Sequence, residues 1–311
     1  MAATLSWREQ RKREKRPIKY KWGSKPCPYM LVTLLISGLD AISNIEEGFI
    51  MAGQKFLYVL LAAILSVFVV DFVAHTAIET HVTSPDLTLL KTAFPKNERI
   101  VYDLTWFGIK AGDITLTVNN IGGDKRRIVA VAKSSPLFSL FYPVEDRFVT
   151  EVSGPQMLPR WIVIRQREGN YRSLKRAIFD QAGLKVLYEK DDEAQVSYDL
   201  PRPAHNEISS FYIMRALPMS IGQSVFVETF ASKKSYTVQV QVLQKERFQT
   251  KLGEVDTIKV KPELLFEGVY QRKGDVYVWL TNDERRIPVK VKGAIRIGSL
   301  VATLADWQIL E

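Results

Sequence analysis

The sequence is poor in the residues from which many functional sites are built. Its 311 residues include one cysteine, Cys27, and three histidines, His75, His81 and His205. This composition excludes a disulfide framework, an iron–sulfur cluster and a multi-cysteine zinc site. No Walker A loop, Rossmann fingerprint, EF-hand loop, His-Glu-x-x-His or Gly-x-Ser-x-Gly motif occurs either. We therefore expect no metal site and no cofactor.

Charge of one sign is also only mildly in excess. The 43 basic and 34 acidic residues give a net charge of +9, and the basic residues form no concentrated stripe within a known nucleic-acid-binding module. Nucleic acid is therefore not an expected partner. With 46% hydrophobic residues and a mean hydropathy of -0.06, the composition is that of a globular protein, which excludes a collagen, a polytopic membrane protein and a mostly disordered chain.

Residues 51–77 have the features of an export signal. Met51 to Lys55 is a short basic start, and Phe56–Val70 is an uncharged, apolar run of 15 residues. Such a run fits a signal peptide better than a full membrane span of roughly 20 residues. A buried core helix is less favoured because the surrounding sequence has no amphipathic pattern.

Two outcomes for this signal stay open. The signal is either cleaved near Ala74 or Ala77, where the preceding residues do not match the small-x-small preference, or retained as an inner-membrane anchor of residues 56–74. In both cases Lys55 stays in the cytoplasm and the chain after Thr76 enters the periplasm. No cysteine follows the run, which excludes a lipoprotein anchor.

Residues 1–50 do not fit this organisation. Their basic stretch, Arg8 to Lys25, is typical of a disordered tail. We predict that the natural start is Met51, because Glu46-Glu47-Gly48 must be encoded by a purine-rich sequence that resembles a ribosome-binding site. A genuine basic cytoplasmic tail is the alternative. Residues 78–95, with Pro85 and Pro95, are interpreted as a tether.

The pattern in residues 96–311 predicts an all-β, mainly antiparallel domain. Apolar residues alternate with polar ones, most clearly from Tyr236 to Val242, and Gly-containing turns separate the runs. About a dozen strands at hairpin spacing favour a barrel or a strongly curved sheet. One short helix is expected at 207–216, capped by Asn206 and ended by Leu217-Pro218, and a shorter turn at 136–142. The strands are expected around 98–107, 114–118, 126–133, 144–152, 158–167, 171–179, 184–189, 223–231, 236–242, 258–261, 275–281, 287–292 and 296–304.

Three stretches resemble an uncharacterised family of exported bacterial proteins, known as domain of unknown function 3108. Val101-Tyr102 through Trp106–Gly112 resembles the first hairpin of that family. Asn206–Pro218 resembles its Asp-x-x-Ser-x-x-Tyr-x-x-Arg-x-x-Pro helix, with Asn206 in place of the usual acid, and Trp279–Val289 with Ile297–Leu300 resembles its closing hairpin. The resemblance implies export and a β-rich fold, and it implies no catalytic residue.

Candidate catalytic groups are few. The acid pairs Glu145-Asp146, Asp191-Asp192 and Asp283-Glu284 are the best candidates for carboxylate chemistry. The last two pairs lie in predicted turns, and only one member of the first could face inward. His205 is interpreted as a loop residue before the helix. We therefore assign no catalytic residue.

Candidate ligand-binding residues are cationic or aromatic. Lys259, Lys261, Lys290 and Lys292 occupy outward strand positions and would form a cationic surface if their strands were neighbours. Its natural partners would be anionic lipid, lipopolysaccharide or acidic glycan; a solvated face is the alternative interpretation. The helix pair of Tyr212 and Arg215 could bind a ligand or fix the helix to the sheet. The full set of candidates is Tyr212, Arg215, Trp279, Arg285 and Arg286.

These observations predict a non-enzymatic, periplasmic binding or scaffolding protein for a lipid, glycan or outer-membrane component. An envelope hydrolase with paired carboxylates is the alternative, and it requires two acids that face each other in a cleft. An outer-membrane barrel is a third interpretation, disfavoured because the predicted helix interrupts the strands.

Overall fold

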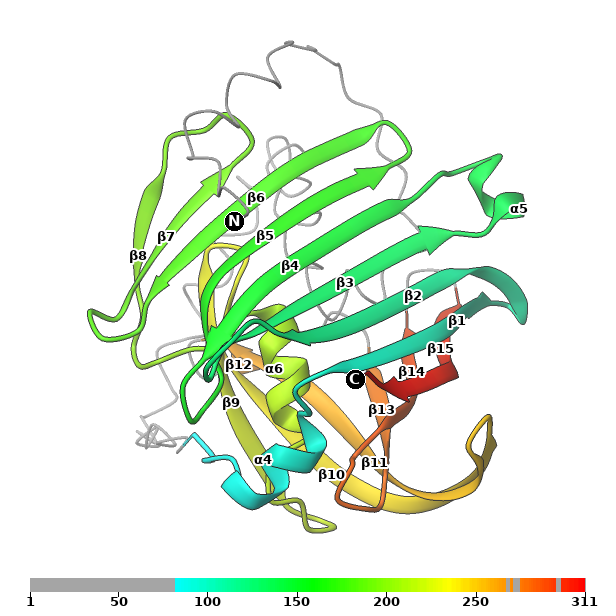
Figure 1. The fold of residues 1–311 in the computed structure, drawn as a ribbon. Coiled ribbons are helices and arrows are strands. Elements are labelled where there is room, and N and C mark those ends of the chain that lie inside the picture. The colour runs from blue at the N-terminus through cyan, green and yellow to red at the C-terminus, as the bar shows by residue number, and fades with distance from the viewer. Residues whose placement is uncertain (1–81, 267–268, 271–274, 295–297, 311) are drawn as a thin grey trace, which may run out of the picture.

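The computed structural model describes residues 82–266, 269–270, 275–294 and 298–310 (Figure 1). The predicted extension (1–50) and export signal (51–77) lie outside these residues. No helix within the described part is long and apolar enough to cross a membrane.

The described chain forms one large antiparallel sheet, which confirms the predicted fold class. Fourteen strands follow one another in the order β8-β7-β6-β5-β4-β3-β2-β1-β15-β14-β13-β11-β10-β9, and β12 pairs with β11. The strands are β1 (Glu98–Trp106), β2 (Ile109–Asn120), β3 (Arg126–Ser134), β4 (Glu145–Ser153), β5 (Leu158–Glu168), β6 (Tyr171–Asp180), β7 (Lys185–Lys190), β8 (Val196–Asp199), β9 (Ser224–Ala231), β10 (Lys234–Thr250), β11 (Gly253–Phe266), β12 (Val269–Tyr270), β13 (Val276–Thr281), β14 (Pro288–Ala294) and β15 (Ser299–Ile309).

Alternation of side chains explains why these segments form strands. In β1, Glu98, Ile100, Tyr102 and Leu104 are buried while the residues between them are partly exposed, as the period of two requires. Most strand ends lie within a few residues of the predicted ones. The sheet joins the two ends of the body, because β1 pairs with β15 from Glu98↔Ile309 to Trp106↔Leu300.

The sheet curls until its two edge strands approach each other. Figure 1 shows the β1–β8 half facing the β9–β15 half. The chain between β8 and β9 crosses the gap, and His205 forms a parallel bridge to Thr229 of β9. The amide of Leu200 donates to the carbonyl of Leu184 at 2.8 Å. We call this junction, residues 200–206, the seam.

Helix α6 (Glu207–Met214) lies between the two halves of the sheet (Figure 1). Asn206 caps it, since its side-chain oxygen accepts from the amides of Ile208 and Ser209, and the Ser209 hydroxyl accepts from the Asn206 amide. The helix is two residues shorter than predicted. Six of its eight residues are buried, so the sheet encloses it from more than the one side that the sequence suggested.

The segment before β1 differs from the predicted tether. Helix α4 (Leu87–Ala93) is capped by Asp86, and Leu90, Ala93 and Phe94 are buried in the core. Backbone hydrogen bonds of 2.9 Å join Thr83 to Phe226 and Asp86 to Ala216. Residues 83–94 therefore pack as part of the domain. A second short helix, α5 (Pro136–Ser139), lies in the connection where a turn was predicted.

Candidate functional site

The centre of the fold holds a fully buried ion pair between Arg215, at the end of α6, and Glu98, at the start of β1. Both side chains are 0% exposed. Two guanidinium nitrogens donate to the two carboxylate oxygens at 2.8 and 2.9 Å, which is the strong bidentate geometry. The indole of Trp307 donates to the same carboxylate at 2.9 Å.

Arg215 also ties the helix to a distant loop. Its guanidinium donates to the backbone carbonyls of Arg285 and Arg286 at 3.1 Å. The guanidinium of Arg215 therefore binds groups of the chain itself, on β1 and in the loop between β13 and β14. The sequence left two roles open for Arg215, ligand binding or attachment of the helix to the sheet. The contacts in the structure attach the helix to β1 and to the loop between β13 and β14.

Tyr212 lies beside this pair, with its ring 5.4 Å from the Arg215 guanidinium and 4.9 Å from the Phe94 ring. Its hydroxyl is buried and has no hydrogen-bond partner in the described part of the chain. Burial, with a further contribution from the negative Glu98, holds the pKa of Tyr212 well above its usual value. This tyrosine remains a neutral phenol at any physiological pH.

Arg285 and Arg286 lie in the loop between β13 and β14 and point in different directions. The Arg285 side chain pairs with Asp283 at 2.9 Å and its guanidinium lies 5.6 Å from the Trp307 ring. The Arg286 guanidinium is partly buried near Met219, and this burial lowers its pKa. The two arginines thus do not converge on one site.

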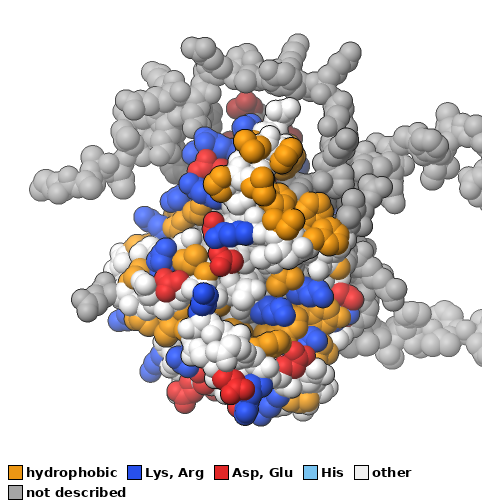
Figure 2. All heavy atoms as spheres, turned by 90° about the vertical axis from the view of Figure 1, so that its right-hand side faces the viewer, with side chains coloured by type: hydrophobic (Ala, Val, Ile, Leu, Met, Phe, Trp, Pro, Cys, Tyr) orange, Lys and Arg blue, Asp and Glu red, His pale blue; other side chains and the backbone are white. Residues whose placement is uncertain are grey.

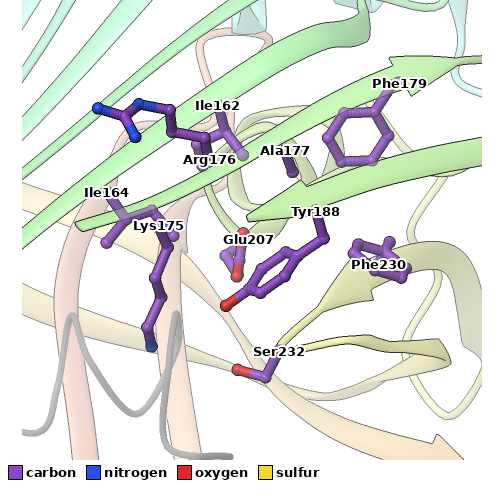
Figure 3. A pocket seen from close by; sticks show the side chains of 10 residues that line it. All are labelled: Ile162, Ile164, Lys175, Arg176, Ala177, Phe179, Tyr188, Glu207, Phe230 and Ser232. Carbon is purple, nitrogen blue, oxygen red and sulfur yellow. The ribbon is translucent and has the colours of Figure 1, made fainter. Parts of the chain in front are cut away.

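Figure 3 shows a pocket between β5, β6, β7, the first turn of α6 and the turn after β9. Lys175, Tyr188 and Glu207 bring polar ends to it, and Phe179 and Phe230 close its apolar side (Figure 3). Its free volume is about 10 Å³, room for about one water molecule. An acyl chain needs a cavity on the order of several hundred Å³, so this pocket does not suit a lipid tail.

The carboxylate pairs do not form a two-acid site. Asp146 is buried and accepts from the Arg167 amide at 2.9 Å, whereas Glu145 points to solvent and pairs with Lys133. Asp191 and Asp192 are exposed in a turn. Within the described residues no group of three or more His, Cys, Asp or Glu side chains could hold a metal ion.

His205 lies buried at the seam, before α6 as predicted. Burial lowers its pKa to about 3, so the imidazole is neutral and cannot act as an acid near neutral pH. One ring nitrogen lies 3.2 Å from the Ser209 hydroxyl.

The strands that carry the predicted cationic surface are neighbours in the sheet. Strand β13 lies between β11 and β14, and the register places Lys259, Trp279 and Lys290 side by side across the three strands. Val260, Val278 and Val291 occupy the opposite face and are buried in the core. We call Lys259, Tyr277, Trp279, Lys290 and Lys292 the lysine–tryptophan face.

Aromatic rings hold two of these lysines in place. The Lys290 ammonium lies 4.9 Å from the Trp279 ring and 5.0 Å from the Phe248 ring. The Lys259 ammonium lies 5.2 Å from the Trp279 ring and 3.2 Å from the Glu246 carboxylate. Trp279 is only 4% exposed because these side chains cover it. Cation–π contacts of this kind fix the positions of the ammonium groups.

Lys290 and Lys292 form no ion pair in the described part of the chain, in contrast to Lys259 and Lys261. Partial burial, with the neighbouring charges of Lys292 and Lys259, lowers the pKa of Lys290, and the nearby Glu246 carboxylate opposes this shift only in part. An anion bound beside Lys290 would relieve this unfavourable electrostatic environment. Of the candidate sites in the described part of the chain, this face offers two lysines, Lys290 and Lys292, that no acidic side chain there pairs with directly.

A comparison with known protein families shows which family the chain belongs to. The model of the family DUF3108, described as a protein of unknown function, matches residues 101–305. The chain belongs to this family. The match covers both halves of the sheet and α6, so the DUF3108 domain comprises most of the described fold.

Two solved structures match this chain at low sequence identity. A β-barrel-like protein of domain of unknown function DUF1849 from Brucella abortus is 10% identical, with a TM-score of 0.48, over 69% of this chain and 98% of that chain. The hypothetical protein CT021 from Chlamydia trachomatis is 7% identical, with a TM-score of 0.34, over 74% and 94%. No curated protein matches the chain.

Sequence reasoning missed several residues that matter here. Glu98 was not singled out, because nothing in its local sequence shows that it faces Arg215 across 117 positions. Phe248 and Tyr277 were also missed, although their outward positions beside lysine-bearing strands were a usable signal.

Proposed function

We propose that this protein is a non-enzymatic binding protein of the bacterial cell envelope, and that it binds the phosphate groups of an anionic lipid or lipopolysaccharide at the lysine–tryptophan face. The export signal predicted from the sequence of residues 51–77 motivates the location. The observation that carries the proposal is that Lys290 and Lys292 form no ion pair with any described residue, on a face where aromatic rings hold the ammonium groups of Lys290 and Lys259.

The chemistry of the face favours phosphate over a small neutral ligand. Lys290 and Lys292, which form no ion pair with a described residue, lie next to the Lys259–Glu246 pair and give a local excess of positive charge, and lysine binds phosphate as a point charge. Trp279 is covered, so it is not free to stack on a sugar; its role is to position the lysines. An enclosed cavity is not needed for a head group bound at the surface.

Binding of lipid A to the full chain in detergent micelles tests the ligand. We expect Lys290→Gln and Lys292→Gln each to weaken binding about fivefold, since one lysine near an anionic lipid surface contributes ~1 kcal/mol. Lys125→Gln and Lys185→Gln, which remove the same charge from exposed positions elsewhere, should leave binding unchanged.

The same assay separates the sources of the anion. Lipid A stripped of its phosphates should bind at least about tenfold more weakly. Inorganic phosphate at millimolar concentration should compete with lipid A if the phosphate alone is recognised. Equal binding of the dephosphorylated lipid, or preference for a phosphate-free acidic glycan, would overturn the proposal.

Export has an independent test. Alkaline phosphatase fused after residue 95 should be active in cells, because the enzyme folds only outside the cytoplasm. Deletion of residues 56–70 should abolish this activity. A native protein recovered from the cytosol would contradict the proposed location.

A further inference from the structure

We propose that one end of the curled sheet inserts into the interface of an anionic phospholipid bilayer. The inserting surface is a group of five apolar side chains on turns, which we call the apolar rim: Phe107, Ile109, Leu137, Leu140 and Phe141. This surface is separate from the lysine–tryptophan face and does not depend on the function proposed there.

The members of the apolar rim are unusually exposed for side chains of their size. Phe141 is 82% exposed, Leu140 78% and Phe107 66%, and Ile109 and Leu137 exceed 50%. Figure 2 faces this end of the molecule and shows hydrophobic side chains gathered in its upper part, with Lys and Arg beside them. Single exposed apolar residues are ordinary, but a contiguous group marks an interaction surface.

Two connections bring the rim together. Phe107 and Ile109 flank the β1–β2 turn, and the other three lie in or after α5, between β3 and β4. The Trp106 ring lies 5.2 Å from the Phe107 ring and 6.1 Å from the Phe138 ring. The Ser135 amide and hydroxyl donate to the carbonyls of Ala111 and Lys110 at 2.8 and 3.0 Å.

The rim is also held in position by local hydrogen bonds. Ser135 caps α5, and the hydroxyls of Ser134 and Ser139 lie 2.6 Å apart across its ends. The Phe107 ring lies directly over Gly298, where any β-carbon would overlap it. The exposed side chains therefore project from a fixed base.

The side chains around the rim are of the types found at a membrane interface. The rim itself consists of Phe, Leu and Ile, which favour hydrocarbon. Trp106 and Tyr142 adjoin it and are partly buried, and Tyr171 is 43% exposed; Tyr and Trp are the residues enriched at head-group depth. Gly169 at the β5–β6 turn donates to the Pro143 carbonyl at 2.8 Å, which places Tyr171 beside the α5 connection.

Basic residues outnumber acidic ones on the outward positions near these turns, by six to four. They are Lys110, Lys133, Arg147, Arg165, Arg167 and Arg172, and Asp103, Asp113, Glu145 and Glu168. Lys110 pairs with Asp103 and Asp113, and Lys133 and Arg167 pair with Glu145, so the local excess is two positive charges. Arg172 contacts only the backbone carbonyls of Gly169 and Tyr171 among its described partners. This excess attracts anionic head groups.

The shape of the surface distinguishes a bilayer from a protein partner. The apolar side chains project from two chain connections, the β1–β2 turn and the α5 segment, whereas protein recognition by apolar anchors ordinarily uses a groove that receives a helix or strand. A bilayer accepts separate projecting side chains without a matching surface.

Spin labels on the full chain provide the test. In a Cys27→Ser background, a label is attached at Phe141→Cys or at Gln156→Cys, an exposed turn position at the opposite end of the strands. With vesicles that contain phosphatidylglycerol, the label at 141 should become less accessible to a water-soluble relaxant and more accessible to oxygen. The label at 156 should not change, and pure phosphatidylcholine should give a smaller effect.

A substitution series isolates the rim from the predicted N-terminal anchor. With the label at Ile109→Cys, the double variant Leu140→Ser/Phe141→Ser should reduce insertion at least about tenfold. Ile178→Ser/Leu187→Ser changes two exposed apolar residues that pair across β6 and β7 and should have no effect. Lys290→Gln should also have no effect, which separates this test from that of the lysine–tryptophan face.

Two results would overturn the inference. The first is an equal accessibility of the label at 141 with and without vesicles. The second is protection of that label without vesicles that increases with protein concentration, since it would assign the rim to contact between two copies of the chain.

Discussion

At the scale of single residues, the interior is organised by polar groups whose partners are far away in sequence. Arg215 binds the Glu98 carboxylate and two carbonyls of the β13–β14 loop, and Trp307 completes the carboxylate. The side chain of Arg215 therefore joins strand β1, helix α6 and the loop between β13 and β14. Burying two charges is costly, and the excellent geometry with added hydrogen bonds offsets that cost.

Removing one partner of this pair should be far worse than removing both. We expect Glu98→Gln to lower the free energy of unfolding by about 3–5 kcal/mol, because an uncompensated guanidinium would remain buried. The double variant Glu98→Leu/Arg215→Met should lose less stability than either Glu98→Leu or Arg215→Met alone. Urea denaturation of the wild type and these three variants measures the coupling, and strictly additive losses would contradict the structural account.

His205 predicts how stability depends on pH. Its pKa is about 3 in the folded state because of burial, against about 6.5 in the unfolded chain. Below pH 6.5 the unfolded state therefore binds the proton more readily than the folded state. The free energy of unfolding should fall by up to ~1.4 kcal/mol for each unit by which the pH is lowered.

A direct comparison assigns this slope to His205. Between pH 6.5 and 5, above the usual range of carboxylate titration, His205→Gln should have a flatter dependence of unfolding free energy on pH than the wild type. The difference between the two curves is the quantity to measure. Parallel curves would mean that the imidazole is protonated in the folded protein.

The sequence shows a residue's type and spacing, and here it shows little of its environment. Helical spacing placed Tyr212 and Arg215 on one side of the helix, and both do point the same way, toward Glu98. The acid itself could not be found, because its partner is 117 positions away. Trp279 illustrates the opposite case: its outward position was predictable, and its coverage by two lysines follows only from the strand order.

At the scale of elements, the strands were predicted almost entirely from the alternation of apolar and polar residues. The predicted strands at 126–133, 158–167 and 171–179 match β3, β5 and β6 closely, because each has one buried and one solvated face. Helix α4 was missed: seven residues show no clear helical period, although Asp86 before an apolar run is a capping signal.

Gly112 in β2 gives a prediction at this scale. It pairs with Ser134 in β3 next to the irregularity in the β1–β2 register, and a β-carbon there would overlap the Lys133 carbonyl oxygen. Since the obstacle is backbone, the two strands would have to separate locally. Gly112→Ala should therefore cost about 1–3 kcal/mol, measured by urea denaturation.

A second glycine serves as the control. Gly123 in the β2–β3 turn has φ of 62° and open space around its α-carbon. Gly123→Ala should cost only the backbone strain, about 1 kcal/mol. If Gly112→Ala were no more costly than Gly123→Ala, the close approach of β2 and β3 would be contradicted.

At the scale of the whole molecule, the unpredicted feature is how the sheet closes. Strand pairing between neighbours in sequence follows from hairpin spacing, but the pairing of β1 with β15 and the seam join segments that local patterns do not connect. The seam contains few backbone hydrogen bonds. Aromatic contacts, such as Phe179 with Phe230 at 6.1 Å, supplement them.

Gln181 is the side chain that holds the seam most directly. Its amide nitrogen donates to the carbonyls of Pro159 and Ala204 at 2.9 and 3.0 Å, and its oxygen accepts from the Ala204 amide at 3.1 Å. Because these bonds replace a regular strand ladder, Gln181→Ala should open the seam without unfolding the sheet.

Hydrogen exchange can locate this opening. The amides of His205 and Phe230 bond across the seam at 2.8 Å, and they should lose protection in Gln181→Ala, whereas the amides of β1 should keep theirs because they lie in continuous ladders with β2 and β15. Gln241→Ala removes a comparable side-chain bond, to Glu263, between two regularly paired strands, and it should leave the seam unchanged. An equal loss of protection in β1 and at the seam would mean that the curled sheet opens as one cooperative unit, so that its closure is as stable as its ladders.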